Sequence, residues 1–408
     1  MIRATGPQMT RSVVYFHAVA VVIAACIAPI FPVPAGAQVA DTAVAEAAPP
    51  FVAGGYDDEP HLRGLFGRIA VGGYAELHAV WQREDGATVE AGFLLKRWNL
   101  LTSTRVSDHV QVWAEVEFEE GGKEVRVELA QIDFLLHHTF NLRGGMLLVP
   151  LGRFNLAHDA PRNEFTDRPL VATDLIGTAL AMPGLGIFGR IPTGTRARAT
   201  YELYAVNGFD AGIIDISPDG TRLTEGGDNV EDNNASPSGV SRVAWFAAEE
   251  HEIGLSAFTG AYNVFRIEGL DVDERRMVRI GAIDARSRFL GLEWNGEAAI
   301  VEVEIPPGLG GIFASRQSGF FLETRRVFGR RWIRPMPAAS FSAALRAEGV
   351  DFDRDLAGDS RIQLTGGLHF RPTPETVFKL DFARGRNRDR FNNPVETAAL
   401  KFSLASYF

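Results

Sequence analysis

The feature that most constrains the fold is an alternation of apolar and polar side chains with a period of two. It is clearest over residues 110–119, 361–370, 378–382 and 397–408. An extended strand points successive side chains to opposite faces, so such a segment has one apolar and one polar face. A helix would scatter the same apolar residues around its surface and bring Lys401 among them. The alternation therefore predicts an all-β protein.

The N-terminus has the pattern of an export signal. Arg3 and Arg11 precede an apolar run over residues 13–30, and Ala35-Gly36-Ala37 supplies a small-residue cleavage site, which predicts a signal peptide over residues 1–37. The stretch that ends at Cys26, the chain's one cysteine, also resembles a lipoprotein signal loosely, although the residues after it stay apolar. A retained membrane anchor is the third alternative.

The rest of the chain excludes several classes of protein. After residue 37 there is no apolar run of about 18 residues, so a helical membrane span is not expected. The net charge of −10 argues against a nucleic-acid partner, which prefers a basic face. Disulfide staples and cysteine-based zinc sites are excluded, since Cys26 lies inside the signal. Residues 38–66 are rich in Ala and Pro and are expected to be a flexible N-terminal segment.

Short and long connections alternate between the expected strands. Among the predicted tight links is Asn295-Gly296, and among the predicted long ones are residues 83–91, 153–183 and 208–239. Counting strands between these links gives about 16, an even number. Short turns at one end and long loops at the other are typical of a transmembrane antiparallel β-barrel, which must close because a sheet in lipid cannot leave its edges unpaired. We therefore predict a barrel over residues 67–408, with long external loops and short periplasmic turns.

The polar face of the expected strands carries ionised side chains, which suits a wet interior. The residues predicted to face the lumen are Glu115, Glu117, Arg361, Lys379, Asp381 and Lys401. A secreted soluble β-sandwich is the competing fold, because its strands alternate as well.

Several segments resemble a known group of proteins. Residues 147–155 (LLVPLGRFN), 167–171 (DRPLV), 183–189 and 201–208 are similar to stretches of Gram-negative outer-membrane porins related to the phosphate-selective O/P family. The C-terminal strand, which ends in Phe408, resembles the terminal strand of such porins. The similarity is strongest over about residues 93–209.

This resemblance implies a homotrimer of 16-stranded barrels in the cell outer membrane, in contact with its lipid. It also implies that Phe408 is a signal for the barrel-assembly machinery, and that residues 153–183 form a loop that folds into the lumen and narrows it. The candidate constriction residues in that loop are Arg153, His158, Asp159, Arg162, Glu164, Asp167, Arg168 and Asp174. An ordinary external loop with a solvated mixture of charges is the alternative.

The chain departs from the resembled group in one respect. An anion pore uses rings of fixed cations, and the group is known for a lysine-rich path, whereas only four lysines follow residue 37 here. Arginines are plentiful at 325–334 and 384–390, but an acidic run at 115–128 opposes them. The sequence leaves the ion preference open.

Motifs for other chemistry are weak. Residues 184–189 match G-x-G-x-x-G, but no helix is expected after them, so they are interpreted as part of a strand. His137-His138 has no ligand partner at metal spacing and is interpreted as a turn, and no nucleophile elbow is present. We expect no enzyme activity, no cofactor and no metal.

The leading functional hypothesis is a water-filled channel for passive diffusion of small hydrophilic solutes or ions, with anions such as phosphate as candidates. The second is a structural or adhesive barrel with a plugged lumen, whose contact site would be the loop at 208–239. The third is a secreted soluble β-protein.

Overall fold

The alternating segments form the walls of one antiparallel β-barrel. The computed structural model describes residues 63–65, 69–214 and 220–408, so the predicted signal peptide lies outside the described residues, as does most of the segment 38–66. The first wall strands are β2 (Ile69–Glu84), β3 (Ala87–Ser107), β4 (Val110–Glu119), β5 (Glu124–His137), β6 (Phe140–Leu148), β7 (Ala181–Pro192), β8 (Arg198–Val206), β9 (Ser238–Ala248) and β10 (His251–Ala261). The others are β13 (Met277–Phe289), β14 (Leu292–Val303), β15 (Arg316–Phe328), β16 (Ser340–Asp351), β17 (Ser360–Thr373), β18 (Thr376–Arg388) and β19 (Pro394–Tyr407).

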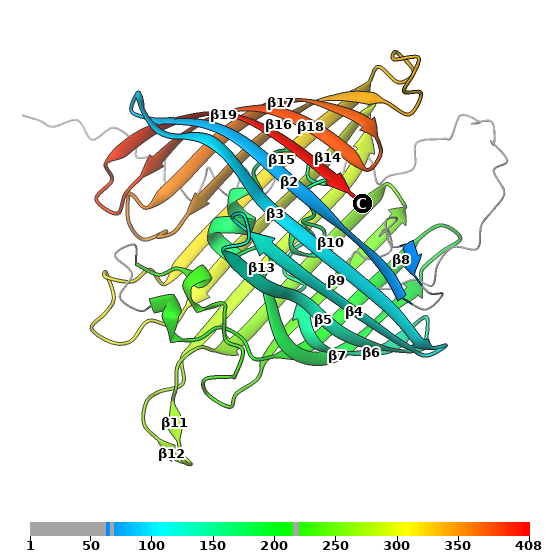
Figure 1. The fold of residues 1–408 in the computed structure, drawn as a ribbon. Coiled ribbons are helices and arrows are strands. Elements are labelled where there is room, and N and C mark those ends of the chain that lie inside the picture. The colour runs from blue at the N-terminus through cyan, green and yellow to red at the C-terminus, as the bar shows by residue number, and fades with distance from the viewer. Residues whose placement is uncertain (1–62, 66–68, 215–219) are drawn as a thin grey trace, which may run out of the picture.

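The barrel closes between its first and last wall strands. Each wall strand pairs with its neighbour in sequence, and β19 pairs antiparallel with β2 from Thr397 opposite Glu84 to Tyr407 opposite Tyr74. Figure 1 shows β19 lying beside β2 on the wall. The short strand β1 (Arg63–Leu65) also pairs with β2. Since closure leaves no unpaired edge around the wall, the predicted antiparallel barrel of 16 strands is confirmed.

Two predicted connections are wrong in detail. Asn295 and Gly296 lie inside β14, where they pair with Arg286 and Ala285 of β13, so they do not form a turn. The turn between the two strands lies at 290–291. That turn uses Leu290 and Gly291 at φ values of 53° and 73°, which a tight hairpin requires. The long loop expected at 83–91 is also wrong, since β2 and β3 extend to a turn at 85–86. The polar residues there belong to two long strands, of 16 and 21 residues, and are mostly exposed. A pattern based on polarity therefore mistakes them for a loop.

The two ends of the barrel differ in their connections. At one end the links are short, for example 138–139, 249–250 and 374–375, and the longest of them covers 329–339. At the other end lie the long segments 149–180, 207–237 and 262–276. The last of these contains a small hairpin, β11 (Arg266–Ile267) with β12 (Leu270–Asp271), which projects from the barrel in Figure 1. We call the two ends the short-turn end and the long-loop end.

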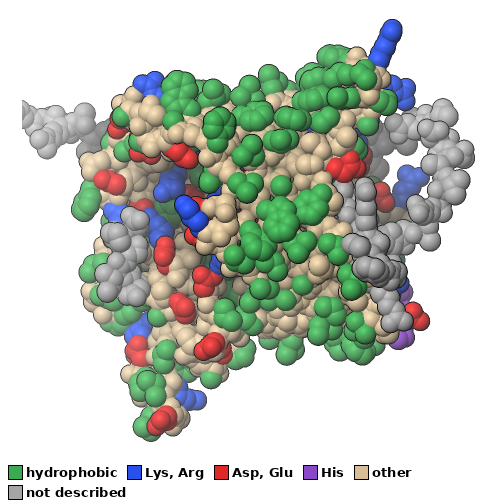
Figure 2. All heavy atoms as spheres, in the orientation of Figure 1, with side chains coloured by type: hydrophobic (Ala, Val, Ile, Leu, Met, Phe, Trp, Pro, Cys, Tyr) green, Lys and Arg blue, Asp and Glu red, His purple; other side chains and the backbone are tan. Residues whose placement is uncertain are grey.

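The outer surface of the wall is apolar. Figure 2 shows hydrophobic side chains over the outside of the strands. Near the short-turn end, five phenylalanines on neighbouring strands form a belt with ring centroids 4.9–6.3 Å apart. The belt consists of Phe328, Phe341, Phe370, Phe378 and Phe402. Aromatic girdles of this kind flank the apolar band of barrels that sit in a membrane.

Short helical turns lie in the long segments and pack inside the wall. They are η3 (Phe154–Leu156), η4 (Val171–Ile176), η5 (Ala211–Ile214) and η6 (Leu223–Gly226). Leu175 of η4 is fully buried in an apolar cluster with Phe321 of β15 and Val350 of β16. Across the described ranges, the structure has no helix that is both long and apolar enough to cross a membrane.

Candidate functional site

The alternation in the sequence separates an inner from an outer face of the wall. On β18, Lys379 and Asp381 are 0% and 3% exposed, whereas Leu380 and Phe382 between and beside them are 48% and 54% exposed. On β4, Glu115 and Glu117 are buried in the same way. The charged residues therefore point into the barrel and the apolar ones away from it.

The segment 149–180, which joins β6 to β7, lies inside the barrel. Its residue Thr166 donates its backbone N–H to Asp381 Oδ2 at 2.7 Å and contacts Ser403 Oγ at 3.0 Å. Lys379 Nζ donates to the carbonyl oxygens of Ala160 at 2.9 Å and Phe165 at 3.0 Å. Since these wall residues all belong to the inner face of β18 and β19, this part of the loop crosses the interior.

Glu164 of this loop binds three wall strands. Its carboxylate accepts hydrogen bonds from Arg325 of β15 at 2.7 Å, Ser342 of β16 at 3.1 Å and His369 of β17 at 2.9 Å. The second ring nitrogen of His369 lies 2.9 Å from Asp381. Burial alone would raise the pKa of Glu164, but the nearby Arg325 guanidinium and His369 hold that pKa well below its usual range. The loop is thus fixed to the wall through an ionised carboxylate.

A second anchor lies on the opposite side of the loop. His158 is 2% exposed, and its two ring nitrogens lie 2.7 Å from Glu128 of β5 and 2.8 Å from the carbonyl oxygen of Asn155. Both neighbours are acceptors, so the ring binds both of them only as the doubly protonated imidazolium. Burial lowers the pKa of His158, but the charge of Glu128 and its hydrogen bond outweigh that effect and raise the pKa above its ordinary value.

The predicted residues are placed as follows. Three ion pairs each join a residue predicted to face the lumen to a residue of the predicted constriction. They are Lys401 with Asp167 at 2.6 Å, Arg361 with Asp174 at 2.7 Å, and Glu117 with Arg168 at 3.9 Å. Lys379, Asp381, Glu164 and His158 have the contacts given above. Glu115 accepts a bond from Asn99, Arg153 contacts Glu252 and Asp159 accepts a bond from Tyr407, while Arg162 lines the cavity described below. Phe408 donates its N–H to Gly73 O, 3.0 Å away, and its ring stacks on Trp98.

Some important residues were not among the predicted set. His369, Glu128, Arg325 and Arg346 all contact the loop or its anchors from inward positions of strands. For His369, Glu128 and Arg346 the signal in the sequence is the alternation itself, since each stands between two apolar residues of a wall strand. Arg325 stands between Thr324 and Arg326 and lacks this signal. Their partners could not be read from it, because each pairing joins residues far apart in the chain.

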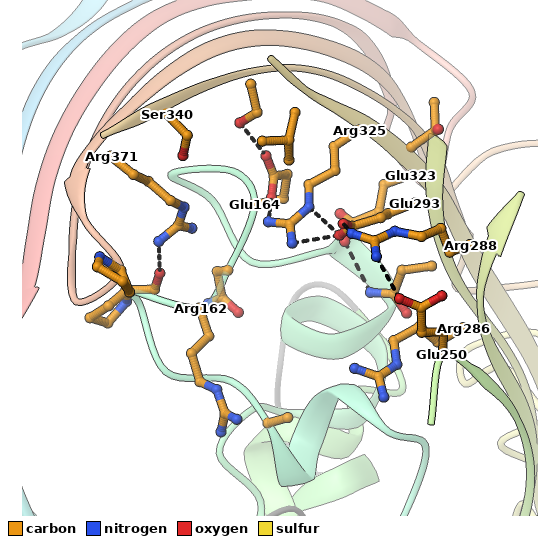
Figure 3. Close-up of a pocket in the computed structure, with 18 of the residues that line it drawn as sticks. Arg162, Glu164, Glu250, Arg286, Arg288, Glu293, Glu323, Arg325, Ser340 and Arg371 are labelled. Carbon is orange, nitrogen blue, oxygen red and sulfur yellow. Dashed lines mark hydrogen bonds and ion pairs between the residues drawn. The ribbon is translucent and has the colours of Figure 1, made fainter. Parts of the chain in front are cut away.

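Two cavities border the loop from opposite ends. The larger, of about 1240 Å³, lies toward the short-turn end and contacts Arg162, Asn163 and Glu164 of the loop. Figure 3 shows the labelled charged side chains, among them Arg162, Arg288 and Arg371, around this space. The smaller, of about 330 Å³, contacts Thr166, Asp167 and Arg168 and lies toward the long-loop end. The two cavities share no lining residue, and Phe165 between these two loop stretches is 1% exposed.

The residues that line the two cavities include more positively than negatively charged side chains. The larger cavity is lined by eight arginines and six glutamates, and the smaller by five Lys or Arg and two Asp. The whole chain, by contrast, has a net charge of −10. Among the described residues, no group of three or more His, Cys, Asp or Glu is arranged to hold a metal ion.

The barrel is similar to solved porins. The outer membrane channel DcaP of Acinetobacter baumannii superimposes with a TM-score of 0.55 and 13% identity, over 83% of this chain and 97% of that one. An anion-selective porin from Comamonas acidovorans gives 0.56 and 11%, over 83% and 99%. The chain has the porin fold. OmpF of Salmonella typhi shares the porin fold with a TM-score of 0.53 and 10% identity, over 83% of this chain and 97% of that one.

Comparison of sequences is less informative. No family model matches the chain. An uncharacterized protein of Aquifex aeolicus (strain VF5) is 25% identical over 364 residues, which cover 81% of this chain and 79% of that protein. The comparison that supports an argument about this chain is therefore the similarity of its fold to that of solved porins.

Proposed function

We propose that this protein is an outer-membrane porin that lets small hydrophilic solutes diffuse passively through its lumen. The observation that carries the proposal is the sorting of side chains on a closed wall, with Lys379 and Asp381 inside and Leu380 and Phe382 outside. Such a wall suits hydrocarbon outside and water inside. The similarity to porins in fold supports the same proposal.

We propose further that the segment 153–183 forms the constriction. The stretch from Glu164 to Asp167 lies between the two cavities and is bonded to β15 through β19. Phe165 contributes the bulk of this layer, with its ring 5.7 Å from that of His369. In this arrangement a solute would pass the charged pairs of the loop on its way from one cavity to the other.

An anion preference is the finer part of the proposal. It is supported by the excess of Lys and Arg over Asp and Glu around both cavities. Fixed cations along a lumen lower the entry barrier for anions. Phosphate is the candidate that the resemblance to the phosphate-selective O/P family suggests, and a homotrimer with Phe408 as the assembly signal is the form that we propose for the protein in the membrane.

The test is a planar-bilayer recording of the purified protein. Wild type should give discrete conductance steps, and Phe165→Ala should raise the conductance of each step because it removes bulk between the two cavities. Phe382→Ala is the matched control, since it makes the same change on the outer face of β18, where the side chain is 54% exposed. If folded, inserted wild-type protein and the Phe165→Ala variant both lack conductance, the plugged structural or adhesive barrel becomes the better account.

A further inference from the structure

An outward row of arginines interrupts the apolar wall near its long-loop end. Along β18 the outward side chains are first Phe378, Leu380 and Phe382 and then Arg384, Arg386 and Arg388. Their inward neighbours Ala383 and Asn387 line the smaller cavity, which fixes the direction of the arginines. Outward side chains on one strand recur about every 7 Å, so three guanidinium groups stand in line on one strand.

A fourth arginine joins this row from a neighbouring strand. Arg83 of β2 pairs with Ala398 of β19, which in turn pairs with Arg384. The inward neighbours of Arg83 and Ala398 line the smaller cavity, so both point outward. Strands in a sheet lie about 4.8 Å apart, which places the backbones of Arg83 and Arg384 roughly 10 Å apart with only an alanine side chain between them. We call Arg83, Arg384, Arg386 and Arg388 the arginine patch.

Protein groups neutralise little of the charge of this patch. Arg386 pairs with Glu396 at 2.5 Å, and both side chains are nearly half exposed. Arg388 donates to the neutral side chain of Asn392, and Arg83 to the carbonyl oxygen of Gly86. Within the described residues, Arg384 has no hydrogen-bond or ion-pair partner. The patch therefore keeps about three of its four positive charges without a carboxylate.

The surroundings of the patch are apolar on the side toward the middle of the wall. Phe382 precedes Arg384 on β18, Leu400 follows Ala398 on β19, and Trp81 precedes Arg83 on β2. These three side chains are exposed, at 54%, 43% and 52%. Lipid-facing arginine destabilises a barrel strongly at the bilayer midplane and only slightly near the interface. A row of arginines directly beside an apolar band is thus favourable where an anionic group meets it at the interface.

We propose that the arginine patch binds the phosphate group of an anionic lipid in the leaflet on the long-loop side. The acyl chains would lie along Phe382, Leu400 and Trp81, on the side of the patch toward the middle of the wall. The phosphate would lie over Ala398, between Arg83 and Arg384. Arginine suits this role because its planar fork binds phosphate oxygens through two parallel hydrogen bonds. The inference rests on the proposed place of the barrel in a membrane, but not on its conductance.

The test is native mass spectrometry of the intact protein in neutral detergent, with phosphatidic acid and phosphatidylcholine of identical chains as probes. Wild type should retain phosphatidic acid and lose phosphatidylcholine. A basic residue near a charged lipid surface contributes about one factor of five in affinity, so Arg384→Gln should weaken retention about fivefold and the Arg384→Gln/Arg388→Gln pair about thirtyfold. Raising the salt concentration should weaken wild-type retention as well.

The matched control is Arg326→Gln. Arg326 is exposed and lies on β15 near the short-turn end, and its inward neighbours Arg325 and Val327 line the larger cavity, so it too points outward. The proposal is overturned if Arg326→Gln weakens retention as much as Arg384→Gln, if phosphatidylcholine is retained equally, or if millimolar inorganic phosphate displaces the lipid, which would make the patch a site for free anions.

A recording of conductance separates this proposal from the proposed function. The patch lies outside the lumen, so Arg384→Gln should conduct as wild type does, and this also shows that the variant folds and inserts. A wild-type barrel that retains phosphatidic acid without conducting would contradict the channel and leave the lipid site standing.

Discussion

Arg143 of β6 and Asp133 of β5 form an ion pair through two hydrogen bonds, of 2.7 and 3.0 Å, with side chains 3% and 0% exposed. The guanidinium also lies over the ring of Phe188 at 4.2 Å and donates to Tyr204 Oη. Removal of one partner from a buried pair leaves an uncompensated charge and typically costs about 3–5 kcal/mol. We expect Asp133→Asn to lower the free energy of unfolding by about that amount, measured by urea titration in detergent.

The control for this prediction is Asp271→Asn. Asp271 pairs with Arg266 in the projecting hairpin, where both side chains are more than half exposed. Exposed pairs contribute little. Equal losses of unfolding free energy in the two variants would mean that burial adds nothing to the stabilisation by the Arg143–Asp133 pair.

His158 gives a pH dependence whose sign follows from its contacts. Its pKa is raised in the folded protein, so its binding to Glu128 stabilises the fold fully below the unfolded pKa of about 6.5 and is lost as the pH rises through the folded pKa. Between pH 6 and pH 9, the urea midpoint of wild type should therefore fall more than that of His158→Gln. A parallel fall in both proteins would show that His158 is not the group that titrates.

At the scale of elements, η4 joins the loop to the wall through apolar packing. Leu175 has no exposed surface and belongs to the cluster that includes Phe321 and Val350. Truncation of a buried leucine costs about 2–5 kcal/mol, and here the loss falls on the contact between the loop and β15 and β16. We expect Leu175→Ala to speed hydrogen exchange in residues 153–183 and to make the open-channel current noisier.

The corresponding control is Leu255→Ala on β10. Leu255 is 61% exposed on the outer face, so its truncation should leave exchange in the loop unchanged. If both variants behave as wild type does, the polar anchors at Glu164 and His158 hold the loop without help from η4.

The elements also show how far sequence alone can lead. The alternation at 378–382 predicts β18 and its inward charges, because a period of two is a local property of one strand. The position of a turn is less local, so Asn295-Gly296, a strong hairpin signal, is extended inside β14 while Leu290 and Gly291 turn. The partner of a charge is not local at all. Glu164 and His369 are 205 residues apart and meet only because the loop crosses the interior of the closed barrel and reaches β17.

For the whole molecule, the net charge of the chain and the summed charge of the residues that line the two cavities have opposite signs. The chain has a net charge of −10, yet thirteen Lys or Arg and eight Asp or Glu line the two cavities. Other acids, such as Glu76 and Asp284, are buried in the barrel and pair with Arg97 and Arg242. A permeating ion would therefore experience the cationic lining of the cavities more than the net charge of the chain. Overall composition is therefore a poor guide to the ion preference of a barrel.

This contrast predicts anion preference, measured as the reversal potential in a tenfold KCl gradient. Wild type should show the sign expected for chloride, and Arg162→Glu should shift the potential toward potassium because Arg162 belongs to the loop and lines the larger cavity. The shift should shrink as both salt concentrations rise, since the Debye length falls from about 10 Å at 0.1 M to about 3 Å at 1 M. Arg326→Glu makes the same change on the outer face and should leave the potential unchanged. A wild-type channel that prefers potassium would mean that the paired arginines of the lining are neutralised where ions pass, and that the carboxylates dominate the narrow part.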